Sequence, residues 1–279
     1  MRTCVVIPTY NESENIDDVI SRVLENAGID ILVVDDSSPD GTADKVRIWS
    51  EKTNNRVSLL SQLKKEVLGK AYINGFKHCI ENGYEIICEM DADLSHDPSA
   101  LPSLVAPILE SSADLVIGSR YVEGGSIPEW SLFRRLLSRG GNVYARIMLG
   151  LKVNDATGGY RAYRADLLNK ILAQDIRADG YGFQIEMTYL ASKAKAKIVE
   201  VPIAFNDRIH GTSKMSFAIV IEALKLVTSN CVRDRVLRRS KSKDIHGATR
   251  PADTTNVIKS VNEHDENTEI RPVEYTGER

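Results

Sequence analysis

The first half of the chain alternates short apolar runs with amphipathic segments. Runs typical of buried strands occupy residues 3–8, 29–34, 57–60, 85–90 and 114–120. Between them, apolar positions recur with helical spacing after residue 11, from about residue 43 and over residues 69–82, and Pro98 stands where a further helix would begin. This alternation predicts an α/β fold with a doubly wound, mostly parallel sheet.

The first predicted helix carries start and stop signals. Asn11 and Glu14 have the spacing of a capping box, in which two side chains satisfy the free amides of a helix start. Gly28 follows the last apolar position and is expected to stop the helix.

In the second half of the chain, the pattern predicts both strands and helices, with additional amphipathic helices toward the C-terminus. The predicted elements are a long amphipathic helix over residues 130–151, a short strand over 158–164, and helices over 167–174, 183–194 and 216–230. Residues 197–205 predict a strand in which Pro202 argues for the sheet edge. From residue 240 the chain is polar with few large apolar residues, so we expect a catalytic domain over 1–239 and a disordered tail over 240–279.

Composition excludes some classes of protein. The 279 residues carry a formal net charge of -3, which gives no general attraction for nucleic acid. None of the four cysteines has metal-ligand spacing, so we expect buried thiols and a reduced, cytosolic setting. The N-terminus does not resemble a signal peptide, and no apolar stretch is long enough to span a bilayer.

Polar residues gather where the predicted strands end. These ends are Pro8 to Glu12, Asp35-Asp36, Asp91-Ala92-Asp93 and Gly118-Ser119-Arg120. In an open α/β sheet, ligands bind at the carboxyl ends of the strands, so these residues predict one site.

Asp91 and Asp93 stand one residue apart at the end of an apolar run, with His96 following. Two neighbouring carboxylates need a cation beside them to stay ionised together. Mg²⁺ and Mn²⁺ prefer one or two carboxylates together with substrate phosphates. We therefore expect a site for a metal and a diphosphate, with Asp93 as the first metal ligand.

Several motifs together resemble a known family. The stretches VVIPTYNESENI, VVDDSSPDGTAD, EMDADLSHDP and GSRY match family 2 glycosyltransferases of the GT-A fold. The later stretches WSLFRRLLSRGGNVYAR, DATGGYRAYR and VPIAFNDRIHGTSKMS look like those of polyprenol-phosphate (dolichol-phosphate) mannosyltransferases. The resemblance covers roughly residues 1–227.

The resemblance implies transfer of mannose from GDP-mannose to a polyprenyl monophosphate with inversion, supported by Mg²⁺ or Mn²⁺. It implies an enzyme at the cytoplasmic face of a membrane, peripheral to it, with a membrane-protein partner left open. By motif, the nucleotide-sugar residues are Pro8, Tyr10, Glu12, Val34, Asp36, Asp91, Ala92, Asp93, Arg120, Arg208 and Lys214. Arg134 and Ser138 are implied to take the acceptor phosphate, so Asp91, Asp93, Arg120, Arg134 and Ser138 form the catalytic set.

The chain departs from the family pattern at two positions. Ser95 replaces a frequent Gln among the metal ligands, and as a shorter ligand it would act through water. The third helix opens with VLGK where the family often has Gly-Leu-Gly, which puts a backbone contact there in doubt.

The residues agree with a phosphate acceptor, which is already an anion near neutral pH and needs cations more than a base. Arginines cluster in the second half, and arginine suits bidentate phosphate binding. The loop NDRIHGTSK holds Arg208 and Lys214 around Gly211 and is expected to close over the diphosphate as a lid. In the segment 130–151, Trp130, Phe133 and other apolar residues interleave with arginines, as in helices that lie on membrane surfaces.

Three alternatives remain at the level of sequence. A related transferase would use a UDP-sugar and move glucose or N-acetylglucosamine. The stretch ILVVDDSS is similar to the acidic pair of phosphoacceptor receiver domains, although the chain is longer than such a domain. A sugar-nucleotide-binding protein without turnover is the third alternative, and the intact Asp91, Asp93, Arg120, Arg208 and Lys214 argue against it.

Overall fold

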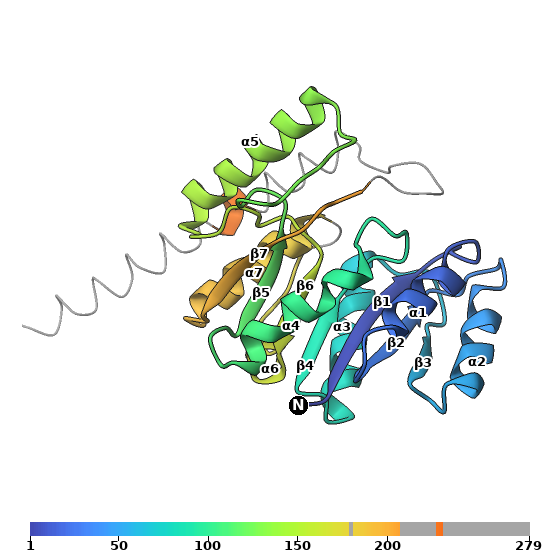
Figure 1. Ribbon diagram of the computed structural model, residues 1–279. Coiled ribbons are helices and arrows are strands. Elements are labelled where there is room, and N and C mark those ends of the chain that lie inside the picture. The colour runs from blue at the N-terminus through green and yellow to red at the C-terminus, as the bar shows by residue number, and fades with distance from the viewer. Residues whose placement is uncertain (179–180, 207–226, 231–279) are drawn as a thin grey trace, which may run out of the picture. The chain divides into compact units, whose positions relative to one another are not determined.

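The computed structural model describes residues 1–178, 181–206 and 227–230, and Figure 1 labels its elements. The strands are β1 (Thr3–Thr9), β2 (Ile29–Asp35), β3 (Val57–Ser61), β4 (Ile86–Glu89), β5 (Leu115–Ser119), β6 (Arg161–Arg164) and β7 (Ile198–Pro202). The helices are α1 (Ile16–Leu24), α2 (Thr42–Lys52), α3 (Leu68–Glu81), the 3-10 turn η1 (Pro98–Ala100), α4 (Leu101–Leu109), α5 (Leu132–Leu149), α6 (Ala165–Leu172) and α7 (Tyr181–Lys193).

The strands form one mixed sheet in the order β3-β2-β1-β4-β6-β5-β7. β1 pairs in parallel with β2 and β4, β2 with β3, and β5 with β7. Only β6, among the described strands, runs antiparallel, between β4 and β5. The predicted doubly wound, mostly parallel sheet is confirmed, and β7 with Pro202 lies at its edge as expected.

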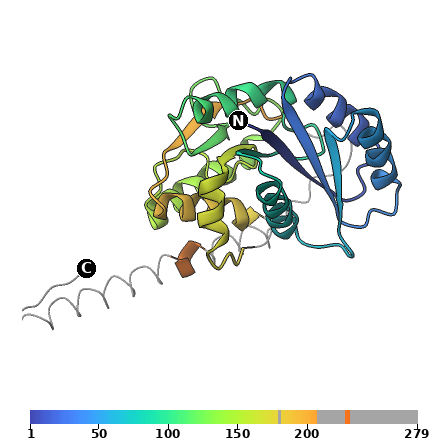
Figure 2. The same cartoon turned by 90° about the horizontal axis from the view of Figure 1, so that it is seen from below.

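Alternating side chains of the strands feed two cores. Cys4 and Val6 of β1 face a core that contains residues of α3, α6 and α7, whereas Val5 and Ile7 face a core with residues of α1, α2 and α4. Figure 2 shows these helices on opposite sides of the strands. Burial on both faces explains why the strands read as continuous apolar runs.

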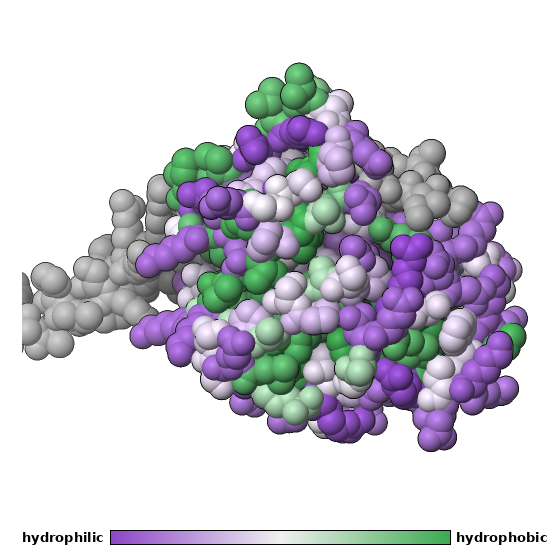
Figure 3. Space-filling view, in the orientation of Figure 1, coloured by the Kyte–Doolittle hydropathy of each residue, from purple (hydrophilic) through white to green (hydrophobic). Residues whose placement is uncertain are grey.

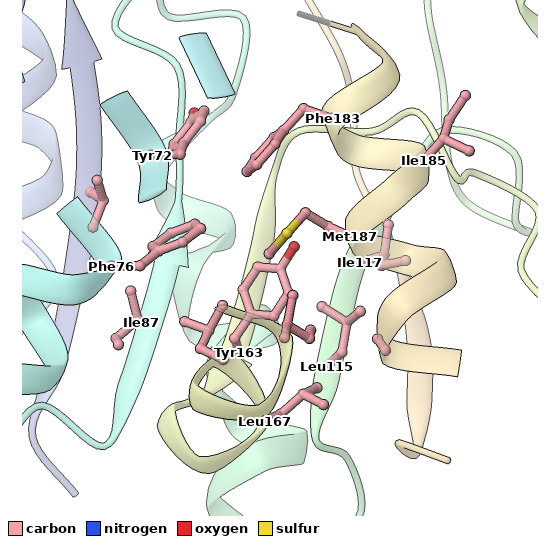
Figure 4. Packing of buried hydrophobic residues seen from close by; sticks show 14 of the residues in the cluster. Tyr72, Phe76, Ile87, Leu115, Ile117, Tyr163, Leu167, Phe183, Ile185 and Met187 are labelled. Atoms are coloured by element: carbon pink, nitrogen blue, oxygen red, sulfur yellow. The ribbon is translucent and has the colours of Figure 1, made fainter. Parts of the chain in front are cut away.

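Aromatic rings fill the first core (Figure 4). Tyr72 and Phe183, from α3 and α7, are stacked with ring centroids 6.1 Å apart, and Phe76 packs against Tyr163 of β6 at 5.8 Å. Gly75 allows the helix α3 to lie close to the sheet, because a Cβ atom at this position would clash with the Val6 side chain. This core fixes β4, whose end carries Asp91, against the elements that follow β6.

The predicted capping box at Asn11 and Glu14 is wrong. Asn11 adopts a left-handed conformation with φ of 60°, and α1 begins only at Ile16. The amides of Asn15 and Ile16 bond to the Glu12 carbonyl, so backbone closes the helix start. Gly28, with φ of 77°, lies in the turn before β2 and does not cap α1 directly.

The long helix expected over residues 130–151 is α5, which begins two residues later because Ser131 caps it by accepting from the Arg134 amide. The short strand and the next two helices are confirmed as β6, α6 and α7. Of the helix expected over 216–230, only 227–230 are described, and they are helical. The tail expected over 240–279 lies outside the described residues.

Candidate active site

The carboxyl ends of β1, β2, β4 and β5 meet at one edge of the sheet, as the sequence predicts. Thr9 and Asp35 pair across β1 and β2, and the Thr9 hydroxyl donates to Asp35 Oδ1 at 2.9 Å. Asp35 also accepts from the amide and the hydroxyl of Ser38 at 2.9 and 2.6 Å. Asp35 is therefore the structural member of the Asp35-Asp36 pair, since its oxygens hold two loops together.

The loop after β1 is held by side chains of the loop after β2 and of the first residue of α2. Three consecutive amides, those of residues 11–13, donate to Ser38 Oγ, Thr42 Oγ1 and Asp40 Oδ2 at 3.0, 3.1 and 3.0 Å. Thr42 also donates to Asp40 at 2.6 Å. Burial acts to raise the pKa of Asp40, but these hydrogen bonds outweigh it and lower the pKa to about 2. The loop with the predicted nucleotide residues Tyr10 and Glu12 is thereby preorganised.

Asp36 differs from its neighbour because it keeps acceptor capacity. Its Oδ2 accepts from the Glu66 amide at 3.2 Å, whereas its Oδ1 is buried and accepts no hydrogen bond from the part of the chain that the structure describes. Burial, reinforced by Asp35 and Glu66, raises the pKa of the Asp36 carboxyl. An unsatisfied buried acceptor is costly and fits a ligand donor such as a base or a ribose hydroxyl.

The other predicted nucleotide residues lie around this loop. Lys65 places its ammonium 3.7 Å from the centre of the Tyr10 ring, a cation–π contact that brings the loop after β3 over Tyr10. Glu12 accepts from the Asn15 side chain at 2.9 Å. Val34 is fully buried in the first core, so only its backbone is placed to meet a ligand, while Pro8 is partly exposed.

Asp91 and Asp93 lie just beyond the end of β4. The Tyr72 hydroxyl donates to Asp91 Oδ1 at 3.2 Å, and the Asp91 side chain is 34% exposed. Asp93 and Ala92 are buried. Ser95 donates its amide and its hydroxyl to Asp93 Oδ1 at 3.0 and 2.5 Å, so the described structure gives Ser95 the role of orienting Asp93.

His96 is a buried neighbour of both carboxylates. Its Nδ1 accepts from the Asp91 amide at 3.1 Å, and its ring stacks on Tyr160 with centroids 4.8 Å apart. Burial lowers the pKa of His96 against the opposing effect of Asp91 and Asp93. The ring is therefore neutral at pH 7 and carries its proton on Nε2.

A buried polar layer lies beneath this strand end, and the sequence did not reveal it. Gln184 donates to Glu89 Oε2 at 2.7 Å, and the fully buried Arg161 donates to the carbonyls of Gly158, Ala156 and Gln184 at 2.7–3.0 Å. Burial raises the pKa of Glu89 to about 7. Arg161 is thus a structural cation that ties β6 to α7.

Arg120, at the end of β5, is held by a residue missed from the sequence. Its Nε and one terminal nitrogen donate to the two oxygens of Asp155 at 2.7 Å each, and its amide donates to Asp155 at 3.1 Å. Asp155 is fully buried. Burial acts to raise the pKa of Asp155, but Arg120 outweighs it and lowers the pKa. The signal was present, because Asp155 opens the motif DATGGYRAYR.

The predicted acceptor residues lie on α5 near Arg120. Arg134 stacks over Trp130 at 3.8 Å, and the Tyr121 hydroxyl donates to Ser138 Oγ at 2.7 Å. Asn142, which is buried, donates to Thr157 Oγ1 at 3.1 Å and accepts from the Ala156 amide at 2.8 Å. The loop that contains Asp155 is therefore joined both to Arg120 and to α5.

Two predicted site residues, Arg208 and Lys214, lie outside the described residues, as does His210. Arg135 instead serves the loop before α5, since it donates to the carbonyls of Ile127 and Pro128 at 2.6 and 3.0 Å.

The outer face of α5 is apolar and exposed. Leu132, Phe133, Leu136 and Ile147 are 70–77% exposed, and Val143 is 49% exposed. Figure 3 shows hydrophobic side chains on the upper side of the molecule, where α5 lies. Trp130, expected on this face, is instead buried. Within the described part of the chain, no helix combines the length and apolarity needed to cross a membrane.

Comparison with known proteins identifies relatives that match most of the chain. The model of glycosyl transferase family 2 matches residues 4–172. An undecaprenyl-phosphate mannosyltransferase of Micrococcus luteus is 47% identical over 232 residues, which cover 82% of this chain and 93% of that protein. A polyprenol monophosphomannose synthase of Mycolicibacterium smegmatis is 42% identical over 238 residues, or 85% and 89%.

Among solved structures, the mannosyltransferase PcManGT from Pyrobaculum calidifontis, in complex with GDP-Man and Mn²⁺, has a TM-score of 0.51 at 16% identity. The match covers 88% of this chain and 79% of that one. At this identity the likeness shows a shared GT-A fold.

Proposed function

The chain belongs to glycosyl transferase family 2, and we propose that it transfers mannose from GDP-mannose to a polyprenyl monophosphate with inversion. The observation that carries this assignment is the identity of 42–47% to two polyprenyl-phosphate mannosyltransferases over nearly their whole length. The reaction belongs to residues 1–239, and the product is a polyprenyl phosphate mannose. The geometry agrees, because Asp36, Asp91, Asp93 and Arg120 all follow the carboxyl ends of strands at one edge of the sheet.

The donor half of the site is the preorganised loop pair after β1 and β2. Asp36 offers a buried oxygen to the guanine or the ribose, and Tyr10 and Glu12 stand on the loop clamped by Thr42 and Asp40. Arg120 contributes positive charge toward the sugar diphosphate while Asp155 fixes its orientation. Arg208 and Lys214 complete the donor contacts in this proposal.

The carboxylates at the end of β4 fit a divalent ion that is shared with a substrate. Asp93 and Asp91 supply hard oxygen ligands, and the described residues include no cluster of three or more His, Cys, Asp or Glu suited to a metal. Mg²⁺ and Mn²⁺ bind in this way, through one or two carboxylates plus substrate phosphates. When bound, the ion neutralises charge on the departing nucleoside diphosphate. Mn²⁺ accompanies GDP-Man in the Pyrobaculum enzyme.

In the transfer, an oxygen of the acceptor phosphate forms a bond to the anomeric carbon while the bond from that carbon to GDP breaks. The nucleophile is already ionised, so a strong general base is not required. Arg134 and Ser138 hold the acceptor phosphate in the proposal, and Arg120 lies near them, since the guanidinium groups of Arg120 and Arg134 both lie within 5.4 Å of the centre of the Trp130 ring. Attack from the face opposite the leaving group inverts the configuration.

The lipid acceptor requires a membrane surface near α5. The apolar face of α5 consists of the exposed Leu132, Phe133, Leu136 and Ile147, and the exposed Arg139 lies on the same helix. Apolar and basic residues combine in this way in helices that lie in a bilayer interface. We assign this face to peripheral contact with the cytoplasmic leaflet.

Asp93 is the most direct single-residue test of the site. Asp93→Ala should lower turnover by roughly a thousandfold or more while circular dichroism stays unchanged. Asp44→Ala, a change at an exposed side chain on α2, is the matched control and should keep full activity. Substantial activity in Asp93→Ala would remove Asp93 from the metal site.

The function itself is tested by mannose transfer. Purified protein is incubated with radiolabelled GDP-mannose, Mg²⁺ or Mn²⁺ and a polyprenyl phosphate, and label is followed into the organic phase with UDP-glucose as a parallel donor. We expect lipid-linked mannose that disappears with EDTA. Transfer from UDP-glucose alone would overturn the sugar assignment.

Full activity of Lys214→Ala would exclude the lid that we propose around residues 206–214.

A further inference from the structure

Trp130 carries a buried hydrogen-bond donor that the fold leaves unused. The side chain is only 6% exposed, and among the described residues its indole Nε1 has no acceptor within hydrogen-bond distance. An indole N–H can only donate, and a buried donor without a partner destabilises a fold. Such a donor at a binding site points to a ligand that supplies the missing acceptor.

The surroundings of Trp130 are cationic on the side of α5. The Arg134 guanidinium lies 3.8 Å from the centre of the indole, and that of Arg120 lies 5.4 Å from it. The indole ring therefore lies beside both Arg120, which is assigned to the donor, and Arg134, which is assigned to the acceptor. Because Asp155 already pairs with Arg120, the attraction for a further anion beside the indole comes from Arg134.

Trp130 also directly precedes the N-terminus of α5. Ser131 caps this helix of 18 residues, and the positive end of a long helix favours an anion. Ser138, one helical turn beyond Arg134, accepts from Tyr121 and retains its own hydroxyl proton for donation. The indole N–H, Arg134, the Ser138 hydroxyl and the helix end all favour the same chemistry, a phosphate oxygen.

We propose that Trp130 is a further acceptor-binding residue, whose indole N–H donates to a phosphate oxygen of the polyprenyl monophosphate. This inference rests on the proposed function, because it presumes a lipid monophosphate as the acceptor. The donor diphosphate has the same oxygen chemistry and is the competing source of the acceptor atom. Packing against Phe205, with ring centroids 5.6 Å apart, explains why an aromatic ring stands here but not why it carries an N–H.

The first test separates the ring from its N–H. Trp130→Phe keeps an aromatic surface for Arg134 and removes the donor, so we expect KM for the polyprenyl phosphate to rise roughly 10- to 100-fold, the effect of one hydrogen bond to a charged group. KM for GDP-mannose should change less than about twofold. An equal rise in both constants, or no rise in either, would overturn the proposal.

A second substitution covers the case in which Trp130→Phe misfolds. The chain holds two tryptophans, and Trp49 lies on α2, where its indole bonds to Asp17 at 2.8 Å. In a Trp49→Phe background, biosynthetic replacement of tryptophan by 3-benzothienylalanine keeps the ring shape at position 130 and removes only the N–H. The same selective rise in KM is expected.

The closing experiment does not depend on turnover. In Trp49→Phe, Trp130 is the only tryptophan, so its fluorescence reports its own surroundings. We expect farnesyl monophosphate in detergent to change the emission with a saturable dependence, and farnesol and GDP to leave it unchanged. A response to GDP alone would assign the indole to the donor, and no response from an enzyme that transfers mannose would overturn the inference while the function stands. A normal response without mannose transfer would contradict the proposed function and leave the phosphate contact in place.

Discussion

The two halves of the site are held together in different ways. On the donor side, three amides of residues 11–13 meet three side chains of the next loop, and each contact joins loops that follow neighbouring parallel strands. On the acceptor side, the loop of Asp155 is joined to α5, and Asp155 also holds Arg120, the arginine assigned to the sugar diphosphate, from 35 positions away. Aromatic rings lie around this ion pair, which borders both halves. The donor half is therefore a pair of preorganised turns, whereas the acceptor half is assembled from distant segments around one buried ion pair.

The largest expected effect follows from breaking that ion pair. Asp155→Ala would leave the Arg120 guanidinium buried without its counter-ion, so the free energy of unfolding should fall by about 3–5 kcal/mol. Urea unfolding measures this loss. Asp155→Asn retains hydrogen-bonding capacity, so its free energy of unfolding should fall less. A loss below about 1 kcal/mol in Asp155→Ala would show that the pair does not hold the acceptor half.

A change on the outer face of α5 should separate lipid binding from folding. Leu136→Glu, at a side chain 70% exposed, should lower vesicle binding by roughly tenfold or more, because a buried Leu contributes about 1.5–3 kcal/mol. Stability should stay within about 0.5 kcal/mol. Ile48→Glu on α2 is the matched control and should float with liposomes as the unmodified chain does. Equal flotation of both variants would place the membrane contact elsewhere.

The donor half should respond to a smaller change. Thr42→Val removes the hydroxyl that accepts from the Glu12 amide and donates to Asp40, so KM for GDP-mannose should rise by the equivalent of about 1–2 kcal/mol. Thr53→Val, at the other end of α2, loses a similar pair of hydrogen bonds and is the control. Its KM should not change. The same rise in both variants would show general loosening of α2 and not loss of the clamp.

The smallest effect concerns pH. The pKa of Asp40 is lowered in the folded state to about 2, so its contribution to stability is complete above about pH 4 and is lost as pH falls through about 2. Asp40→Asn should therefore flatten the dependence of unfolding on pH between about 4 and 2 and leave it unchanged near neutrality. Parallel curves for the two proteins over that range would contradict the assigned role of Asp40.

The same contrast explains what the sequence could predict. Asp35, Asp36, Asp91 and Asp93 were predicted to lie together because each follows an apolar strand, and parallel strands bring such positions to one edge. The antiparallel β6 between β4 and β5 was not predicted, since four residues give no sign of their direction. Nor was the pairing of Asp155 with Arg120, because an ion pair between distant positions leaves no local pattern, and only the motif DATGGYRAYR pointed to Asp155.

Local signals also failed where tertiary contacts replaced them. Asn11 and Glu14 have capping-box spacing, yet the clamp from Ser38 holds the Asn11 amide and α1 starts later. Trp130 reads as part of an amphipathic helix, yet it is buried before that helix begins. In both cases a residue with a strong local preference is used by the site.

The most direct test of the two-halves account measures each ligand against one variant of each half. Asp36→Asn should weaken GDP binding, measured by calorimetry, by roughly tenfold or more and leave KM for the polyprenyl phosphate unchanged, because only the donor half loses an acceptor atom. Arg134→Ala should raise KM for the polyprenyl phosphate and leave GDP binding unchanged. If either variant weakens both ligands to the same degree, the donor and acceptor do not occupy separate halves, and the proposed arrangement of the site is wrong.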